Sequence, residues 1–124
     1  MHVYVVRHGE AAPGEPDELR RLTPNGREQA RRLRAELGTS FDAVLSSPLL
    51  RARETAELVA GRTPEPDERL APGATADDVR AAVAGRGDRV LVVGHEPDCG
   101  RIVAALTGEQ VRSFRPCGHA VVEL

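Results

Sequence analysis

Hydrophobic and polar residues alternate along the chain in blocks that predict strands separated by helices. Residues 2–6 form a short run of β-branched and aromatic side chains, residues 90–93 are entirely apolar, and residues 41–45 resemble both runs. Residues 120–124 have the composition of a closing strand. The runs at 2–6 and 90–93 end abruptly in polar turns. Each therefore predicts a buried strand with polar groups at its carboxyl end.

Helix signals lie between these runs. Thr23-Pro24 and Ser47-Pro48 each combine a capping hydroxyl with a proline suited to a first helical turn, and the predicted helices end near Gly38 and Val59. Two further helices are expected, one from the capping-box-like pair Thr75 and Asp78 to Gly85, and one that contains Ile102, Val103 and Leu106. The proline-rich residues 61–73 predict an extended connection with one short edge strand.

Strands that alternate with helices indicate an α/β fold, a three-layer sandwich in which a mostly parallel central sheet has helices on both faces. The balance of 40% hydrophobic and 29% charged residues suits one domain, residues 1–124. Ligands of such sheets bind beyond the carboxyl ends of the strands. The strands at 2–6 and 90–93 lead to His8 and His95, so we expect the functional site at that edge.

Composition excludes several classes of function. A formal net charge of −2 and the scarcity of aromatic residues argue against a nucleic-acid surface. All 17 basic residues are arginine, which excludes Schiff-base chemistry and the phosphate-loop nucleotide motif because both require lysine. Cys99 and Cys117 are too few for a disulfide framework and lack the paired spacing of a zinc site. No apolar run approaches a membrane-spanning length and no signal peptide is evident, so we expect a cytoplasmic protein.

Four short motifs carry the candidate chemistry. They are Val5-Val6-Arg7-His8-Gly9-Glu10, then Leu22-Thr23-Pro24 with Gly26 and Gln29-Ala30, then Leu45-Ser46-Ser47-Pro48 with Arg51-Ala52 and Thr55-Ala56, and finally Gly94-His95-Glu96-Pro97. In order and spacing they resemble the signatures of the histidine phosphatase superfamily, which includes phosphoglycerate mutases and many phosphatases. The resemblance covers essentially the whole chain and implies a phosphoglycerate mutase-like fold.

The resemblance also implies a role for each site residue. It makes His8 the nucleophile that accepts the phosphoryl group, and His95 a donor to a phosphoryl oxygen. Arg7 and Arg51 would bind the phosphoryl group, since a planar guanidinium donates two parallel hydrogen bonds to phosphate oxygens. Gly9 would let the backbone approach the ligand. A neutral imidazole can attack only if its other nitrogen is held as a donor, and we expect a backbone carbonyl near Gly9 to hold it.

Because it is short, the chain most resembles the short phosphohistidine phosphatase branch called SixA. This resemblance implies hydrolysis of protein phosphohistidine through a covalent phosphohistidine on His8. The shortness of the chain predicts a shallow, open pocket that could admit a phosphohistidine on the surface of another protein. Two alternatives stay open: a phosphomonoesterase of the same superfamily that acts on a small metabolite, and a non-catalytic module that binds phosphate or a phosphoprotein. The partner is accordingly a phosphorylated protein or a small phosphorylated metabolite, with no nucleic acid and no membrane, and the chain is expected to be a monomer.

The general acid is the least defined element. Many larger relatives use a carboxylate to protonate the leaving oxygen, and the loosely comparable residue here is Glu68, although acids in proline-rich connections are usually solvated. Phosphohistidine makes a missing acid tolerable, because its phosphorus–nitrogen bond is labile and solvent can protonate the leaving imidazole. Glu10 is expected to be a local hydrogen-bonding group, and at least one of Arg20 and Arg21 to face water.

Two other enzyme classes are disfavoured by spacing. A metal hydrolase is disfavoured because no His-Glu-x-x-His motif is present and Arg7 beside His8 would repel a cation. A cysteine phosphatase needs an arginine six positions after its cysteine, and neither Cys99 nor Cys117 has one. We therefore expect a metal-independent enzyme without a cofactor.

Overall fold

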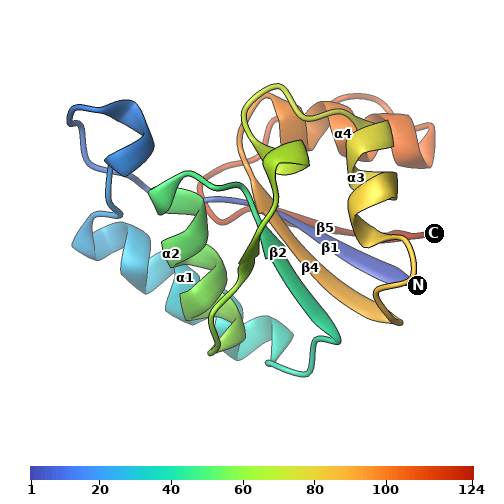
Figure 1. Ribbon diagram of the computed structural model, residues 1–124, viewed down its shortest axis with the longest axis horizontal. Helices are drawn as coiled ribbons and strands as arrows, with labels where there is room; N and C mark the ends of the chain where they lie inside the picture. Colours follow the sequence, from blue (N-terminus) through green and yellow to red (C-terminus); the bar gives the residue numbers. More distant parts are fainter.

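Five strands form one sheet in the computed structural model, which describes residues 1–124 (Figure 1). The strands are β1 (His2–Arg7), β2 (Ala43–Ser46), β3 (Glu65–Pro66), β4 (Arg89–Gly94) and β5 (His119–Glu123), in the spatial order β3-β2-β4-β1-β5. All neighbouring pairs are parallel except β1 and β5, which are antiparallel. The prediction of a mostly parallel sheet, including the short edge strand in residues 61–73, is confirmed.

Four α-helices and two short 3₁₀ helices connect the strands. They are η1 (Asp17–Leu19), α1 (Pro24–Leu37), α2 (Leu50–Ala60), η2 (Glu68–Leu70), α3 (Ala76–Val83) and α4 (Asp98–Thr107). None of the helices is both long and apolar enough to cross a membrane. The Thr23 hydroxyl caps α1 by accepting from the amide of Gly26, and Thr75 and Asp78 form the predicted capping box of α3.

The start predicted for α2 is wrong in detail. The residue before its first turn is Leu49, which offers no capping side chain, and the helix begins at Leu50 rather than directly after Ser47-Pro48. The Ser47 hydroxyl instead accepts from the amide of Leu49 at 3.2 Å, which closes a turn ahead of the helix, and it lies 2.8 Å from a ring nitrogen of His95. A serine that matches a cap signal thus contributes to the candidate site.

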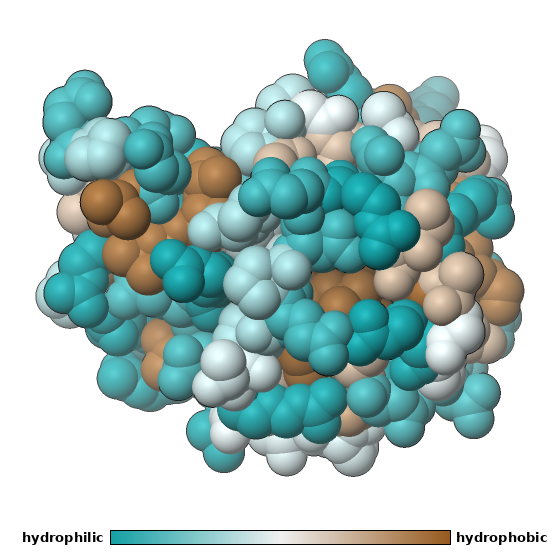
Figure 2. All heavy atoms as spheres, viewed as in Figure 1, coloured by the Kyte–Doolittle hydropathy of each residue, from teal (hydrophilic) through white to brown (hydrophobic).

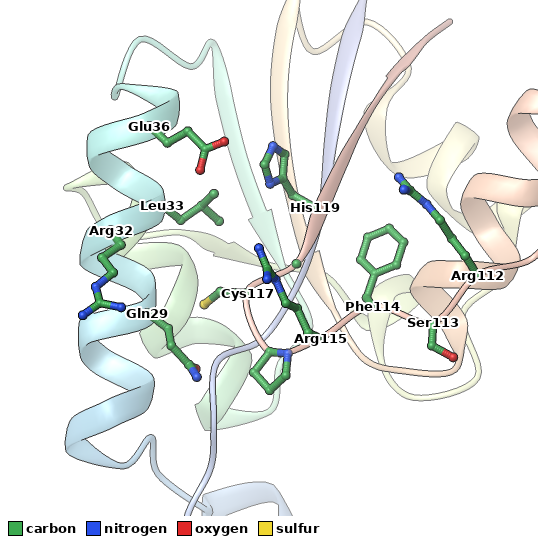
Figure 3. Close-up of a pocket in the computed structure, with 12 residues that line it drawn as sticks. Gln29, Arg32, Leu33, Glu36, Arg112, Ser113, Phe114, Arg115, Cys117 and His119 are labelled. Atoms are coloured by element: carbon green, nitrogen blue, oxygen red, sulfur yellow. The ribbon is translucent and has the colours of Figure 1, made fainter.

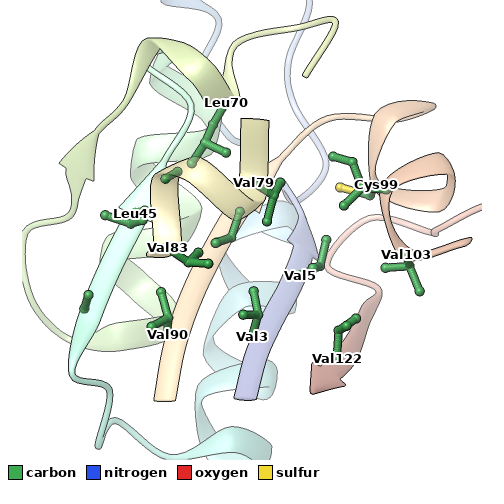
Figure 4. Packing of buried hydrophobic residues seen from close by; sticks show 14 of the residues in the cluster. Val3, Val5, Leu45, Leu70, Val79, Val83, Val90, Cys99, Val103 and Val122 are labelled. Atoms are coloured by element: carbon green, nitrogen blue, oxygen red, sulfur yellow. The ribbon is translucent and has the colours of Figure 1, made fainter. Parts of the chain in front are cut away.

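The three-layer arrangement follows from the alternation of side chains along the strands. Figure 1 shows α1 and α2 on one face of the sheet and α3 and α4 on the other. Val3 and Val5 of β1 pack in the core that includes α3 and α4, as Figure 4 shows, whereas Val6 packs in the core that includes α1 and α2. Each of these valines is almost fully buried, a burial that stabilises the fold by about 1.5–3 kcal/mol per side chain.

Strand register aligns the turns that carry the candidate residues. Arg7 at the end of β1 pairs with Gly94 at the end of β4, and Ser46 at the end of β2 pairs with Val93. Because these three strands are parallel and adjacent, the residues that follow them emerge side by side at one edge of the sheet. His8, His95 and Ser47 are those residues.

Candidate active site

His8 lies immediately beyond β1, and a hydrogen bond fixes the position of its proton. Its Nδ1 atom lies 2.7 Å from the carbonyl oxygen of Gly9. Because a carbonyl only accepts hydrogen bonds, Nδ1 carries the proton and Nε2 keeps its lone pair in the neutral ring. Nε2 has no hydrogen-bond partner in the protein. The backbone carbonyl expected near Gly9 is that of Gly9 itself, and it leaves a nucleophilic nitrogen free for a ligand.

The turn after β1 is anchored to α1 and α2. The amide of Gly9 donates to Thr55 Oγ1 at 3.0 Å, and the Thr55 hydroxyl donates to the carbonyl of Arg51 at 2.8 Å. A Cβ at position 9 would come within 2.8 Å of the carbonyl oxygen of Gly26 in α1. Glycine is therefore required at this position because the backbone of α1 fills the space that a side chain would take.

His95 lies immediately beyond β4 and faces the first histidine. The two imidazole rings have centroids 5.2 Å apart, and the side chain of His95 is only 4% exposed. Its Nε2 atom lies 2.8 Å from Ser47 Oγ, while Nδ1 has no hydrogen-bond partner in the protein. One ring nitrogen of His95 is thus held by the protein and the other is free to meet a ligand. The backbone amide of His8 also donates to the carbonyl of Gly94, which ties the two turns together at 3.0 Å.

Arg7 is held in a way that leaves half of its guanidinium free. Its Nη1 donates to the carbonyl oxygen of Phe114 at 2.8 Å. Its Nε is buried without any hydrogen-bond partner, and Nη2 has none in the protein either. Since Nε–H and Nη2–H point in the same direction, they form the side-on fork that binds two oxygens of one oxyanion. An unpaired buried donor costs free energy, so binding an oxyanion at this orphaned Nε would satisfy it.

Arg51 lies in the first turn of α2 and is 7% exposed. It donates from Nη1 to the carbonyl of Asp17 at 2.9 Å and from Nη2 to Oδ2 of the same residue at 3.3 Å. Asp17 belongs to η1, in a segment that protrudes at the upper left of Figures 1 and 2. A hydrogen bond from Arg20 holds the pKa of Asp17 below its usual value, and the charge of Arg51 lowers it further. An ionised carboxylate thus restrains the Arg51 guanidinium.

The surroundings keep both imidazoles neutral. Burial lowers the pKa of His8 to about 4; the hydrogen bond to Gly9 opposes this shift, and the charges of Arg51 and Arg7 add to it. Burial lowers the pKa of His95 to about 3, and the charges of His8 and Arg51 lower it further. The same arginines act on both histidines, so the four side chains form one electrostatic unit.

We expect His8 to protonate near pH 4 and His95 near pH 3 in a titration of their imidazole nitrogens by NMR, with assignments from His8→Asn and His95→Asn variants. An unfolded chain protonates histidine near pH 6.5, so between that pH and the folded values the unfolded state binds more protons. The free energy of unfolding should consequently fall as the pH falls through this window. A midpoint near 6.5 for His8 would show that the ring is not desolvated.

The structure thus brings together Arg7, His8, Arg51 and His95, with Gly9 in the turn that orients the nucleophilic candidate. Glu68, the candidate general acid, makes no contact with these residues. It is exposed at the start of η2, and its carboxylate makes no hydrogen bond or ion pair with the protein.

Three neighbouring charged residues have other contacts. Glu10 accepts hydrogen bonds from the side chains of Thr23 and Asn25 at 2.9 and 3.1 Å, so its predicted local role is confirmed. Arg21 is largely exposed and pairs with Glu54 at 3.5 Å. Arg20 instead donates to the carbonyl of Ala12 and to Asp17, and its charge is close enough to lower the pKa of His8.

Sequence reasoning assigned no chemical role to Ser47, Thr55 or Asp17. Ser47 and Thr55 both lie inside the motif that contains Arg51, and this placement was the one sequence feature that could have indicated their role in the site. Asp17 carried no comparable signal, because it lies in a proline- and glycine-rich loop 34 positions before its partner.

The residues around His8 and His95 do not form a set of metal ligands. No group of three or more His, Cys, Asp or Glu side chains in the chain is placed to hold a metal ion. Both cysteines are buried thiols, and burial raises the pKa of Cys99 to about 12 and that of Cys117 to about 11. The two histidines are accompanied instead by guanidinium and hydroxyl groups, a donor set suited to an oxyanion.

Several known proteins are similar to this chain in sequence and in fold. The model of the histidine phosphatase superfamily (branch 1) matches residues 3–72, the stretch that contains Arg7, His8 and Arg51. An uncharacterized protein from Picosynechococcus sp. is 37% identical over 134 residues, a match that covers 96% of this chain and 77% of that protein. The mitochondrial serine/threonine-protein phosphatase Pgam5 of Drosophila persimilis is 42% identical over 62 residues, which cover 47% of this chain and only 22% of that protein.

Among solved structures, the protein histidine phosphatase SixA complexed with tungstate is similar to this chain with a TM-score of 0.87 and 31% sequence identity. The superposition covers 100% of this chain and 88% of that one. The likeness therefore includes the segment with His95, which the family model does not reach.

Proposed function

The chain belongs to the histidine phosphatase superfamily and is a phosphatase, and we propose that it removes the phosphoryl group from phosphohistidine in a protein through a covalent intermediate on His8. The observation that carries the proposal is the likeness to SixA over the whole chain, combined with the free Nε2 of His8. Tungstate, which that SixA structure holds, is a tetrahedral oxyanion like phosphate.

The proposed reaction has two displacement steps at phosphorus. In the first, the lone pair of His8 Nε2 forms a bond to phosphorus while the bond to the substrate imidazole breaks, and the leaving nitrogen takes a proton from water. In the second, a water oxygen attacks phosphorus and the bond to Nε2 breaks, which returns the electron pair to His8. The water gives up its protons to the released phosphate and to solvent. The hydrogen bond from Nδ1 to Gly9 keeps the attacking nitrogen unprotonated throughout.

The remaining side chains stabilise charge on the transferring group. Arg7 offers Nε and Nη2 to two phosphoryl oxygens, and the buried Arg51 adds a second positive charge. For His95 to donate as well, its proton must lie on Nδ1, and the Ser47 hydroxyl must then donate to Nε2. Ser47 is thus proposed to select the tautomer of His95, and Thr55 to hold the turn at Gly9.

A phosphohistidine substrate suits a site without a carboxylic acid near the leaving group. Glu68 is solvated, and Asp17 is held ionised by Arg20 and Arg51, so neither is suited to donate a proton. A phosphomonoester needs such a donor because an alkoxide is a poor leaving group, whereas an imidazole leaves readily and is protonated by water. Metal independence is proposed for a related reason, since Arg7 and Arg51 supply the positive charge that a metal ion supplies elsewhere.

The test is a comparison of substrates. We expect kcat/KM on a synthetic phosphohistidine peptide to exceed that on a panel of sugar and nucleotide phosphates by roughly 100-fold or more, because these leaving groups differ in their need for an acid. Incubation with excess EDTA should leave the rate unchanged. A strong preference for one metabolite phosphate would reject the proposed substrate class, and a loss of activity with EDTA that added Mg²⁺ or Zn²⁺ restores would reject metal independence.

A further inference from the structure

A groove of about 660 Å³ lies between α1 and residues 112–119 (Figure 3), and Phe114, whose carbonyl holds Arg7, is its one residue with a part in the candidate site. Its volume is within the roughly 300–1,000 Å³ that is common for ligand sites. In Figure 3, Gln29 and Glu36 of α1 lie on one side, with Arg115 and His119 on the other. The groove is therefore bounded by a helix and by the segment that leads into the edge strand β5.

The groove begins directly beside the turn that carries His8. The amide of Cys117, on the groove wall, donates to the carbonyls of Arg7 and His8 at 3.1 and 3.3 Å. On the opposite wall, Gln29 Oε1 accepts from the amide of Glu10 at 2.9 Å. Both walls are thus joined to the two ends of the Arg7–Glu10 turn. The groove therefore lies against the backbone of the turn that carries His8.

The charge of the lining is opposite to that of the whole protein. The chain carries a formal net charge of −2, yet the groove is lined by Arg32, Arg112 and Arg115 with Glu36 as its single carboxylate. Arg112 and Arg115 are exposed and form no ion pair, whereas Arg32 pairs with Glu28 of its own helix at 3.5 Å. Two unpaired cations at the rim of a site for a phosphorylated protein are available for an intermolecular carboxylate.

We propose that this groove binds an acidic, extended stretch of the phosphoprotein substrate next to its phosphohistidine. The inference rests on the proposed function, since it names the sequence context that the same site selects. Arg112 and Arg115 supply the complementary charge, and the groove holds the chain beside the attacking His8. Because exposed ion pairs are individually weak and screened by salt, the effect is a preference in KM rather than a requirement for catalysis.

Three synthetic phosphohistidine peptides test the proposal: one with four glutamates after the phosphohistidine, one with four glutamates before it, and one with serines in both places. At low ionic strength we expect one of the two glutamate peptides to show a kcat/KM roughly 10-fold above that of the serine peptide, through KM, and to lose this advantage at 0.5 M NaCl. The double variant Arg112→Glu/Arg115→Glu should abolish the preference and leave the rate on inorganic phosphoramidate unchanged.

The matched control reverses two exposed arginines of α3 and α4, on the other face of the sheet, in Arg80→Glu/Arg101→Glu. This control should keep the preference. Equal rates on all three peptides, or a preference that survives in the Arg112/Arg115 variant, would overturn the docking proposal. If no phosphohistidine peptide is hydrolysed, the proposed function fails on its own. Fluorescence anisotropy with a labelled, unphosphorylated tetraglutamate peptide then still tests whether the groove binds acidic peptides. We expect the wild type to bind this peptide and the Arg112/Arg115 variant to lose the binding.

Discussion

A His8→Ala variant is expected to lose turnover by roughly 10⁴-fold or more and to trap no phosphoryl label. Wild-type protein mixed with radiolabelled substrate and quenched within one turnover should carry phosphate that is stable to base and released by acid, as a phosphorus–nitrogen bond requires. The variant should carry none, because alanine offers no lone pair for attack. The free Nε2 of His8, opposite the hydrogen bond to Gly9, is the physical basis of this expectation.

Two further variants sharpen the measurement. His2→Ala removes a histidine at the amino-terminal end of β1, paired with Glu123 at 3.1 Å, and should keep both the label and the rate. His95→Ala should slow formation of the label without abolishing it, since His95 is proposed to donate to the phosphoryl oxygens and not to receive the group. Label on the His8→Ala protein, or label that depends on His95 alone, would contradict the assignment of the nucleophile.

Much of the fold was predictable because its determinants are local. Short, valine-rich apolar runs such as 90–93, bounded by polar turns, are typical of strands in a sheet covered on both faces, and Thr23 and Thr75 cap their helices within three residues. The antiparallel direction of β5 was not specified by its sequence. A short alternating run is compatible with either direction, and the choice depends on where residues 108–118 return the chain.

The candidate site was predictable for a different reason. His8 and His95 each follow a buried strand, so a sheet that places β1 beside β4 in register must bring them together. Ser47 was misread because a serine before a proline satisfies the sequence pattern of a helix cap just as well as that of a turn residue that contacts a histidine. Only the neighbouring β4 turn, 48 positions later, decides between the two.

Long-range polar contacts account for the rest of what the sequence did not reveal. Asp17 restrains Arg51 across 34 positions, and Phe114 accepts from Arg7 across 107. Neither partner is singled out by residue type, since one is a loop acid among several and the other contributes only a backbone carbonyl. Such contacts depend on the tertiary path of loops, for which periodicity and capping carry no information.

An Arg7→Lys variant is expected to lower kcat/KM by roughly 100-fold while the protein remains folded. Arg7 performs two tasks at once, because Nη1 donates to Phe114 while Nε and Nη2 stay free for two oxygens of one phosphoryl group. A lysine ammonium keeps the charge but is a single donor centre, so it can anchor to the carbonyl or bind the phosphoryl group, not both in the same geometry. The dissociation constant for inorganic phosphate should rise in parallel.

The matched control is Arg80→Lys, an exposed arginine of α3 without an ion-pair partner, which should leave both constants unchanged. Thermal unfolding of Arg7→Lys separates the two tasks. A small change in Tm with a large loss of kcat/KM places the loss in the phosphoryl contact, because the Phe114 carbonyl can still be satisfied. Wild-type kcat/KM in Arg7→Lys would show that a point charge suffices at this position, and the bidentate geometry inferred from the orphaned Nε would then be wrong.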